Sequence, residues 1–248
     1  MTLEALAGHV VGPAPFSATT EAVAGFVAAT GDDAVRWTEF APPGLAAAAF
    51  FAVAPSLLAE PGVARFGASL LHTEQAFSWH RALRIGEALL VSGRVTAVRS
   101  RGSRHLVSFA VEAVGGEGLW MEGASTFLLS DQATGPGPDA GEPPMGERAA
   151  FDPMEAARLP REGESLPPLR RSASRADLLA YAAAGGDWNP IHRDHEAARA
   201  GGLPGVVAHG LLLAAWLLQA AARFRPGPYP LRSAQVRFRR PLRPAVSA

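Results

Sequence analysis

The sequence predicts an α+β protein in which antiparallel strands wrap around a central apolar helix. Residues 88–98, 106–114 and 119–129 alternate between apolar and polar side chains and are separated by glycine-containing turns, a pattern that indicates strands. Residues 211–222 are apolar on nearly every side, which is typical of an enclosed helix. A long apolar helix together with a run of antiparallel strands favours a sheet folded around a helix.

Composition excludes several classes of protein. The 248 residues suffice for one large domain or two of about 120 residues. Because 23 basic residues balance 23 acidic ones, we expect no nucleic acid and no anionic membrane surface as partner. The chain has no cysteine, which excludes disulfides, thiolate metal sites and a cysteine nucleophile. The first residues lack a basic n-region, and the longest apolar stretch is too short to span a bilayer, so we expect a cytoplasmic protein.

A stretch rich in Gly, Pro and Glu divides the chain. Its composition predicts an interdomain linker over residues 132–167, between domains at 1–131 and 168–248.

The two flanking parts resemble each other in three places that occur in the same order. Residues 30–32 match 185–187, each ending in Gly-Asp; Gly44 and Gly210 each open an apolar helical pattern, the first over residues 45–58; and residues 79–84 match 238–243. These matches predict an internal duplication.

The segment from Asp187 to His192 gathers a carboxylate, an amide and an imidazole, and Gly210 follows soon after. Asn189 within it is the only asparagine of the chain. An acid/base pair beside a candidate oxyanion donor predicts chemistry on an activated carbonyl compound. Free Asp titrates near ~4 and free His near ~6.5, and an apolar cleft shifts both, so the residues leave open which is the base.

Residues 181–192, followed by 205–211, resemble the MaoC-like dehydratase family of hotdog-fold proteins, which includes (R)-specific enoyl-CoA hydratases. The resemblance covers roughly residues 5–130 and 168–243. It implies tandem hotdog folds, each an antiparallel sheet wrapped around a central helix, with a degenerate first copy. It further implies reversible hydration of an enoyl thioester of coenzyme A or acyl-carrier protein in fatty acid metabolism, with no metal and no redox cofactor.

The resemblance also implies roles for four residues. Asp187 and His192 would hold and activate the water. Asn189 would orient a catalytic side chain or brace its loop. Gly210 would let a thioester oxygen approach the N-terminus of the central helix, where backbone N–H groups are free.

Two departures from the family pattern lead to further expectations. Trp37 stands five positions after Asp32, where the second half has His192, so the first half should be non-catalytic. The first half continues about 45 residues beyond Arg84, whereas the second stops five residues after Arg243. We therefore expect a C-terminally incomplete second hotdog, completed by a homodimer mate or a partner chain, or else a truncated, inactive product.

Other charged residues receive weaker predictions. Arg237, Arg239 and Arg240 either contact coenzyme A phosphates or form a solvated rim. His209 is predicted to be a helix-entry residue rather than a second base, and His195 to be exposed. The remaining histidines have no carboxylate at metal-ligand spacing and are predicted to be structural: His9, His72, His80 and His105.

Two alternative functions remain open at this point. The chain could be a non-catalytic acyl-thioester-binding subunit or truncated pseudoenzyme, because the second half is short. It could also be a hotdog thioesterase, although the Asp-x-Asn-Pro-x-His spacing favours a hydratase. The sequence leaves open the acyl chain, the carrier, the physiological direction and whether the short C-terminus is biological.

Overall fold

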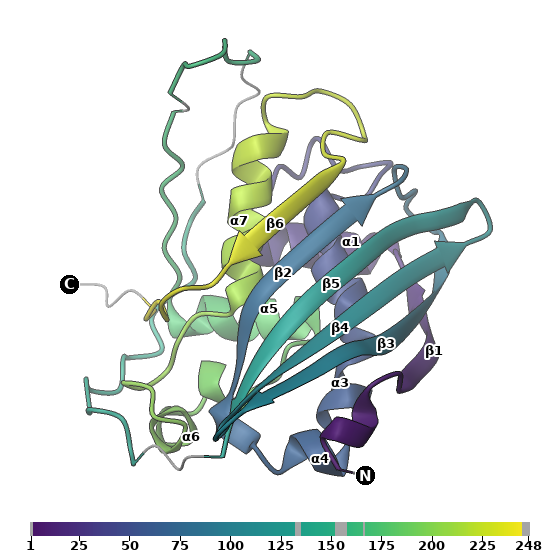
Figure 1. Cartoon of the computed structure of the whole chain (residues 1–248). Helices are drawn as coiled ribbons and strands as arrows, with labels where there is room; N and C mark the ends of the chain where they lie inside the picture. The colour runs from purple at the N-terminus through teal and green to yellow at the C-terminus, as the bar shows by residue number, and fades with distance from the viewer. Residues whose placement is uncertain (1, 132–134, 152–157, 166, 245–248) are drawn as a thin grey trace.

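The computed structural model describes residues 2–131, 135–151, 158–165 and 167–244. One six-stranded antiparallel sheet has the strand order β1-β3-β4-β5-β2-β6 (Figure 1). The strands are β1 (Val10–Ser17), β2 (Leu70–Trp79), β3 (Ala88–Arg101), β4 (Arg104–Gly115), β5 (Gly118–Ser130) and β6 (Ser233–Arg237). This arrangement confirms the predicted α+β class.

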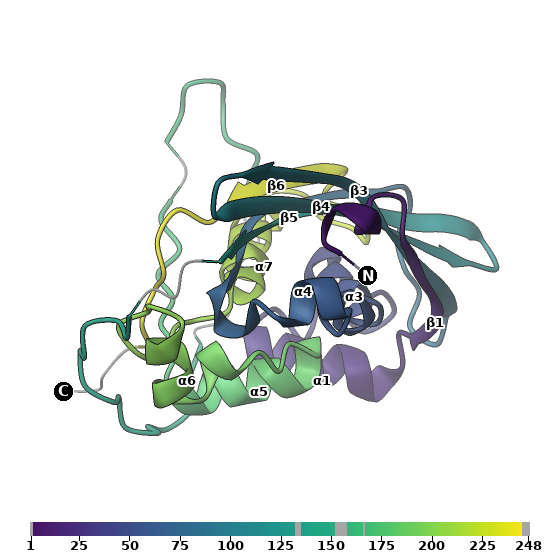
Figure 2. The same cartoon turned by 60° about the horizontal axis from the view of Figure 1, so that its bottom comes forward.

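Helices cover one face of the sheet. They are α1 (Thr20–Thr30), α2 (Ala46–Phe51), α3 (Ala54–Leu58), α4 (Pro61–Ala64), α5 (Arg175–Gly185), α6 (His195–Ala200) and α7 (Gly210–Ala222). The short 3₁₀ turns are η1 (Glu4–Leu6), η2 (Pro43–Leu45), η3 (Gly67–Ser69) and η4 (Pro190–His192). Figure 2 shows α3, α4 and α7 between the sheet and an outer layer formed by α1 and α5. None of the described helices combines the length and apolar character needed to cross a membrane.

The three predicted strands are present and extend beyond their predicted ends as β3, β4 and β5. Their alternation reflects the two faces of the sheet: Val107, Phe109 and Val111 on β4 are buried, whereas Leu106 between such positions is 40% exposed. The β3–β4 hairpin closes through Gly102, whose φ of 58° suits a tight turn.

The two apolar helices differ in continuity. The predicted helix over residues 211–222 is confirmed as α7. The single helix predicted over residues 45–58 is wrong, because the chain forms η2, α2 and α3 instead. Pro55 lies in the first turn of α3 and has no N–H to continue an α2 hydrogen-bond ladder, so the helix is interrupted at residues 52–53.

Strand β6 joins the second part of the chain to the sheet of the first. It pairs antiparallel with β2, with Ser78 opposite Ser233 and Glu74 opposite Arg237. The similar segments 79–84 and 238–243 each follow one of these two paired strands, which agrees with the predicted duplication. Among the described residues after 167, β6 is the one strand. The domain limits 1–131, 132–167 and 168–248 stay a prediction.

Counterparts in the two halves also contact each other. Phe26 on α1 and Tyr181 on α5 occupy matching positions, and their ring centroids are 6.1 Å apart. The carbonyl of Thr30, at the end of α1, accepts hydrogen bonds from Trp216 Nε1 (3.0 Å) and Gln219 Nε2 (3.2 Å) on α7. The end of α1 thus supports the helix whose first turn lies at the candidate site.

Candidate active site

Helix α5 positions Asp187. Ser174 and Asp177 form a reciprocal capping box at its start, which satisfies backbone N–H groups that no helical carbonyl reaches. The helix ends at Gly186, whose φ of 77° is readily adopted by glycine. The chain therefore reverses there, and Asp187 leaves the helix with only 9% of its surface exposed.

Asn189 organises the turn that follows. Its Oδ1 accepts a hydrogen bond from the N–H of Ile191 (3.3 Å), which caps η4, and its own N–H donates to Asp187 Oδ1 (3.3 Å). Pro190 occupies the first position of η4, where its fixed φ suits the turn. Asn189 therefore braces the segment that separates Asp187 from His192.

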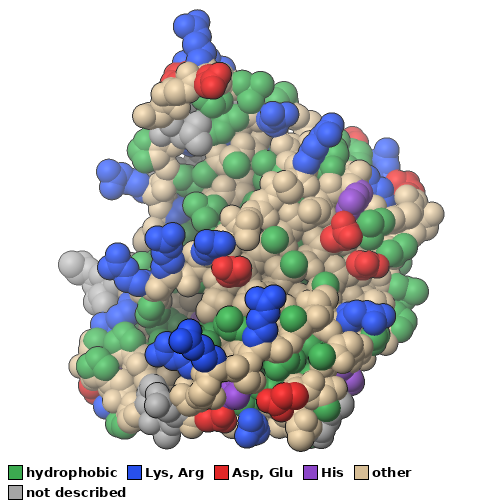
Figure 3. All heavy atoms as spheres, viewed as in Figure 1, with side chains coloured by type: hydrophobic (Ala, Val, Ile, Leu, Met, Phe, Trp, Pro, Cys, Tyr) green, Lys and Arg blue, Asp and Glu red, His purple; other side chains and the backbone are tan. Residues whose placement is uncertain are grey.

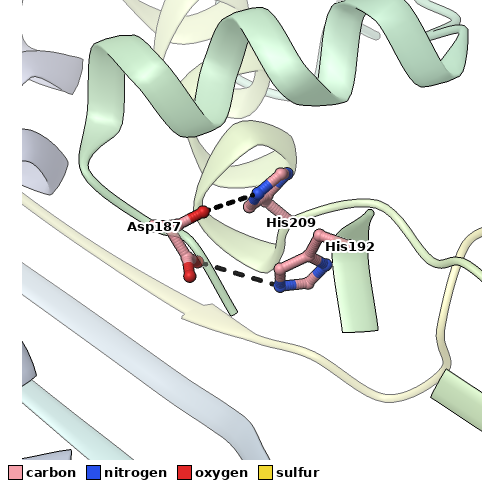
Figure 4. A group of neighbouring side chains, drawn as sticks. All are labelled: Asp187, His192 and His209. Carbon is pink, nitrogen blue, oxygen red and sulfur yellow. Dashed lines mark hydrogen bonds and ion pairs between the residues drawn. The ribbon is translucent and has the colours of Figure 1, made fainter. Parts of the chain in front are cut away.

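The side chains of Asp187 and His192 face each other (Figure 4). His192 Nδ1 lies 2.8 Å from the carbonyl oxygen of Val207, so this nitrogen carries the proton and donates it. Nε2 then offers its lone pair toward Asp187 Oδ2, 3.8 Å away. This separation is too long for a direct hydrogen bond and leaves both atoms able to share a water or a substrate hydroxyl.

His209 belongs to the same cluster, although the sequence predicted only a helix-entry residue. It is fully buried as the N-cap residue of α7, but its side chain does not cap the helix. Instead, Nε2 lies 3.1 Å from the carbonyl oxygen of Asp187, and its ring stacks on that of His192 with centroids 3.9 Å apart. A histidine at a helix start, where Ser, Thr, Asp or Asn is usual, was the available sequence signal.

Burial dominates the electrostatics of the cluster. Desolvation raises the pKa of Asp187, while the nearby His192 charge and the Asn189 N–H oppose the rise. Desolvation, together with the charge of His192, lowers the pKa of His209 well below its usual value. The pKa of Tyr181 is raised well above 10 by burial and by the Asp187 charge. Tyr181 and His209 are therefore neutral near pH 7.

The start of α7 provides backbone donors beside this pair. Gly210 is its first residue, and the N–H groups of Gly210 and Leu211 have no acceptor among the described residues. Unpaired N–H groups at a helix N-terminus attract negative charge. Phe238, which follows β6, packs its ring against Gly210 on the side where a β-carbon would stand.

These groups line a cavity of about 320 Å³. Both halves of the chain form its walls. Its polar residues include Asp187, Asn189, His192 and His72, and Gly210 lies beside them; its apolar residues include Phe51, Leu58, Leu70, Phe127, Ile191, Leu203, Leu213 and Phe238. The predicted pair and Gly210 therefore share one largely apolar pocket with a few polar groups, which is the usual character of a small-molecule site.

Three of the cluster residues could in principle hold a metal ion. Asp187, His192 and His209 each offer a ligand atom, and these atoms lie within 4.8 Å of one another. Nε2 of His209 is hydrogen-bonded to the carbonyl of Asp187, whereas its Nδ1 has no partner among the described residues. The sequence prediction of a site without metal stays a prediction.

The three predicted arginines also line this cavity. Arg237 lies 3.0 Å from Glu74 and forms an ion pair on the sheet surface. Arg239 and Arg240 form no ion pair with any residue in the described ranges. Basic side chains gather on this face around the end of β6 (Figure 3). Within the described residues, Arg239 and Arg240 are accordingly the predicted arginines at the pocket wall that have no ion pair.

One prediction for the other histidines is wrong, that for His195. His195, expected to be exposed, is 7% exposed and lies 3.1 Å from Asp139. His9, His80 and His105 each contact a carboxylate distant in sequence: Glu60, Glu122 and Asp131. His72 lines the cavity between the rings of Phe127 and Phe238.

The corresponding turn of the first half carries no acid/base pair. Asp32 Oδ1 accepts the N–H of Asp33 at 2.8 Å, and burial raises the pKa of Asp32. The aromatic ring of Trp37 is buried five positions later. Neither Asp32 nor Trp37 lines the cavity around Asp187.

Comparison with known proteins agrees with this architecture. Residues 159–245 match the MaoC like domain, and residues 5–117 match the FAS1-like dehydratase domain region. These matches confirm the predicted resemblance to MaoC-like dehydratases. A MaoC-like dehydratase structure covers 97% of this chain and 84% of its own at 22% identity and a TM-score of 0.75. The structure of HtdX from Mycobacterium tuberculosis, 26% identical, has a TM-score of 0.65 and covers 95% and 84% of the two chains.

Two curated relatives are similar in sequence. The 3-hydroxyacyl-thioester dehydratase X of Mycobacterium tuberculosis is 31% identical over 174 residues, 69% of this chain. The mitochondrial 3-hydroxyacyl-acyl-carrier-protein dehydratase of Arabidopsis thaliana is 31% identical over 93 residues, 38% of this chain. The alignments span 55% of the length of each relative.

Proposed function

We propose that this protein is a hydro-lyase acting on acyl thioesters. The premise is that the chain carries a MaoC-like domain and a FAS1-like dehydratase region. It would catalyse the reversible interconversion of a 3-hydroxyacyl thioester and an enoyl thioester plus water. The observation that carries this proposal is the buried Asp187–His192 pair, whose Oδ2 and Nε2 atoms are 3.8 Å apart. The pair shares one pocket with Gly210, the first residue of α7.

The pair can handle both protons of the reaction. In the hydration direction, water oxygen bonds to C3, one water proton passes to a side chain, and C2 gains a proton. His192 can accept at Nε2 because Nδ1–H is committed to the carbonyl of Val207. The raised pKa of Asp187 brings its proton exchange closer to neutral pH. Dehydration uses the same groups in reverse.

The start of α7 would stabilise the intermediate. Addition at C3 moves negative charge onto the thioester oxygen, and the N–H groups of Gly210 and Leu211 have no competing acceptor in the described chain. A single donor of this kind contributes about 3 kcal/mol to a transition state. The reaction changes no net oxidation state, so the proposal requires no redox cofactor.

We propose that the thioester is carried by coenzyme A or an acyl-carrier protein. Both carriers present phosphate groups, and Arg239 and Arg240 are unpaired cations at the pocket wall. The curated relatives are named for 3-hydroxyacyl thioesters and for an acyl-carrier protein, which supports either carrier.

A further strand from a second copy or a partner chain would complete the sheet. Strand β6 pairs with β2 on one edge and with no other strand in the described residues. The edge of β6 that faces away from β2 is left unpaired by the described residues, and an unpaired strand edge favours pairing with another chain. Light scattering on the purified chain should therefore show a dimer, and a concentration-independent monomer would contradict this part of the proposal.

The proposal is tested with a series of enoyl-CoA and enoyl-carrier-protein thioesters. Hydration removes the conjugated double bond, so the ultraviolet absorbance of the enoyl thioester should fall without release of free thiol. Release of thiol would instead identify a thioesterase. A wild-type protein that binds the thioesters but performs neither reaction would be a non-catalytic binding subunit. The Asp187→Asn/His192→Ala double variant is the control for contaminating activity.

A further inference from the structure

We propose that His209 is the positioning residue of this site: its imidazole holds the main chain of Asp187 and supports the ring of His192. This inference rests on the proposed function, which assigns the chemistry to Asp187 and His192. The side chain of His209 contacts both residues. Its place at the start of α7 and its burial do not by themselves account for these two contacts.

The first contact anchors the Asp187 turn. The carbonyl oxygen of Asp187 can only accept, so His209 Nε2 carries a proton and donates it across 3.1 Å. This bond fixes the tautomer of His209 and leaves its Nδ1 with a lone pair and no partner among the described residues. Asp187 lies in the turn between the end of α5 and η4. A hydrogen bond to its carbonyl therefore fixes the position of this turn.

The second contact supports His192 from the face of its ring. The two imidazole planes are 30° apart with centroids at 3.9 Å. A neutral ring in this position stabilises a positively charged neighbour, as an aromatic face does for a cation, whereas two charged rings would repel. His209 can therefore favour the protonated form of His192 that the reaction requires, provided that His209 itself stays neutral.

The surroundings of His209 keep it neutral. The titratable groups that face it are Asp187, His192 and Tyr181, whose ring centroid is 5.0 Å from that of His209. The hydrogen bond of His209 goes to the carbonyl oxygen of Asp187, and an oxygen of the Asp187 carboxylate lies within 4.8 Å without a hydrogen bond to it, so complete burial is what opposes a positive charge on the His209 ring. The lowered pKa of His209 agrees with this geometry.

A role limited to capping α7 does not account for these contacts. An N-cap side chain accepts from the first N–H groups of its helix, and His209 makes no such bond. Its side chain instead reaches the backbone of Asp187, 22 residues earlier in the chain.

Two substitutions separate the two contacts. His209→Gln keeps an amide donor for the Asp187 carbonyl but removes the stacked ring, and His209→Phe keeps the ring but removes the donor. We expect each to lower kcat by about 10- to 100-fold, the scale of a misplaced catalytic group, with KM changed by less than about threefold. The control is His195→Gln, which alters a buried histidine of α6 outside the pocket.

The pH profile supplies a readout that a purely structural role would not change. In His209→Gln, the limb of the kcat/KM profile that follows His192 protonation should move to lower pH, because the supporting ring is gone. In His209→Phe the limb should stay in place. Folded variants with the wild-type kcat, or with equal losses and an unchanged profile in both, would overturn the inference.

A measurement on the wild-type protein does not depend on activity. Nitrogen NMR of the imidazoles should show His209 as the neutral Nε2–H tautomer from about pH 8 down through about pH 6.5, where a free imidazole titrates. A His209 that titrates in this range, or an Nδ1–H tautomer, would overturn the inference even if the variants fail to fold. If the spectrum is as expected but no thioester is hydrated, the proposed function fails and the arrangement of His209 stands.

Discussion

Gly210 lies directly against the ring of Phe238, and a β-carbon built on Gly210 would meet three atoms of that ring at 3.3 Å. The close approach of Phe238 leaves no free room for a side chain at the start of α7. An added methyl group would displace the ring and alter the approach to the backbone N–H groups of the helix.

Gly210→Ala should therefore impair catalysis more than stability. We expect kcat/KM to fall by about 10- to 100-fold, the scale of a disturbed oxyanion donor. The matched control is Gly25→Ala, also in a helix, where a β-carbon meets nothing within 4 Å. The control should gain about 0.5–1 kcal/mol of stability at unchanged activity. Equal activities of the two variants would refute the role of Gly210.

Asp187→Asn should lower the turnover and raise the melting temperature near pH 7. Turnover should fall by about 100-fold or more, the usual scale for an acid/base group, and His192→Ala should do the same. Burial raises the pKa of Asp187, so the folded state favours the neutral carboxyl. The contribution of this neutral carboxyl to the unfolding free energy is lost as pH rises through the raised pKa. Near pH 7 the variant should therefore melt higher than the wild type, and this advantage should disappear toward pH ~3.8. A variant that keeps near wild-type turnover would remove Asp187 from the mechanism.

Asn189→Ala should loosen the catalytic turn by removing the cap of η4. We expect a loss of about 1 kcal/mol in unfolding free energy and a fall in kcat of about 10-fold or more. Asp194→Ala removes a comparable cap, the acceptor for Ala197 N–H at the start of α6, outside the pocket. It should lose similar stability and keep its kcat. If both variants keep wild-type kcat, Asn189 is merely a cap.

Arg239→Gln and Arg240→Gln should weaken binding of the carrier rather than the chemical step. Loss of one phosphate contact should raise KM for a CoA thioester by about 3- to 10-fold at low salt, with kcat nearly unchanged. The difference should shrink as salt screens the charges. Arg94→Gln, an exposed position on β3, is the control. A KM that is independent of both arginines and of salt would identify them as a solvated rim.

Stability should fall in acid because of His72. Its Nε2–H donates to the carbonyl of Glu74 (3.0 Å), and desolvation lowers the pKa of His72 to about 4 from 6.5. The unfolded chain binds this proton first, so stability present above pH 6.5 is lost as pH falls toward 4, by up to about 3 kcal/mol. Denaturant unfolding across this range should show a shallower pH slope in His72→Gln. Identical slopes in His72→Gln and the wild type would disprove the assignment.

Local patterns explain which parts of the structure the sequence predicted. The strands around Val107 and the apolar helix α7 follow from periodicity, because each pattern reflects one local geometry. The pairing of Asp187 with His192 could be predicted because both residues belong to one short motif, five positions apart in the sequence. The contacts of His209 and the partner of His195 depend on segments distant in the chain, 22 and 56 residues away, and no local pattern contains them. Pro55 is a local signal for the break in the helix predicted over residues 45–58, whereas the apolar run across the same residues favours an unbroken helix.

The carbonyl of Thr30, which accepts from Trp216 and Gln219, has a consequence for fragments of this protein. Because β6 also pairs with β2 along one of its edges, each half relies on backbone groups of the other. A chain cut within residues 135–151 should stay associated through these bonds and melt in a single step. Residues 168–248 expressed alone should then recover a native-like spectrum only when residues 1–131 are added back.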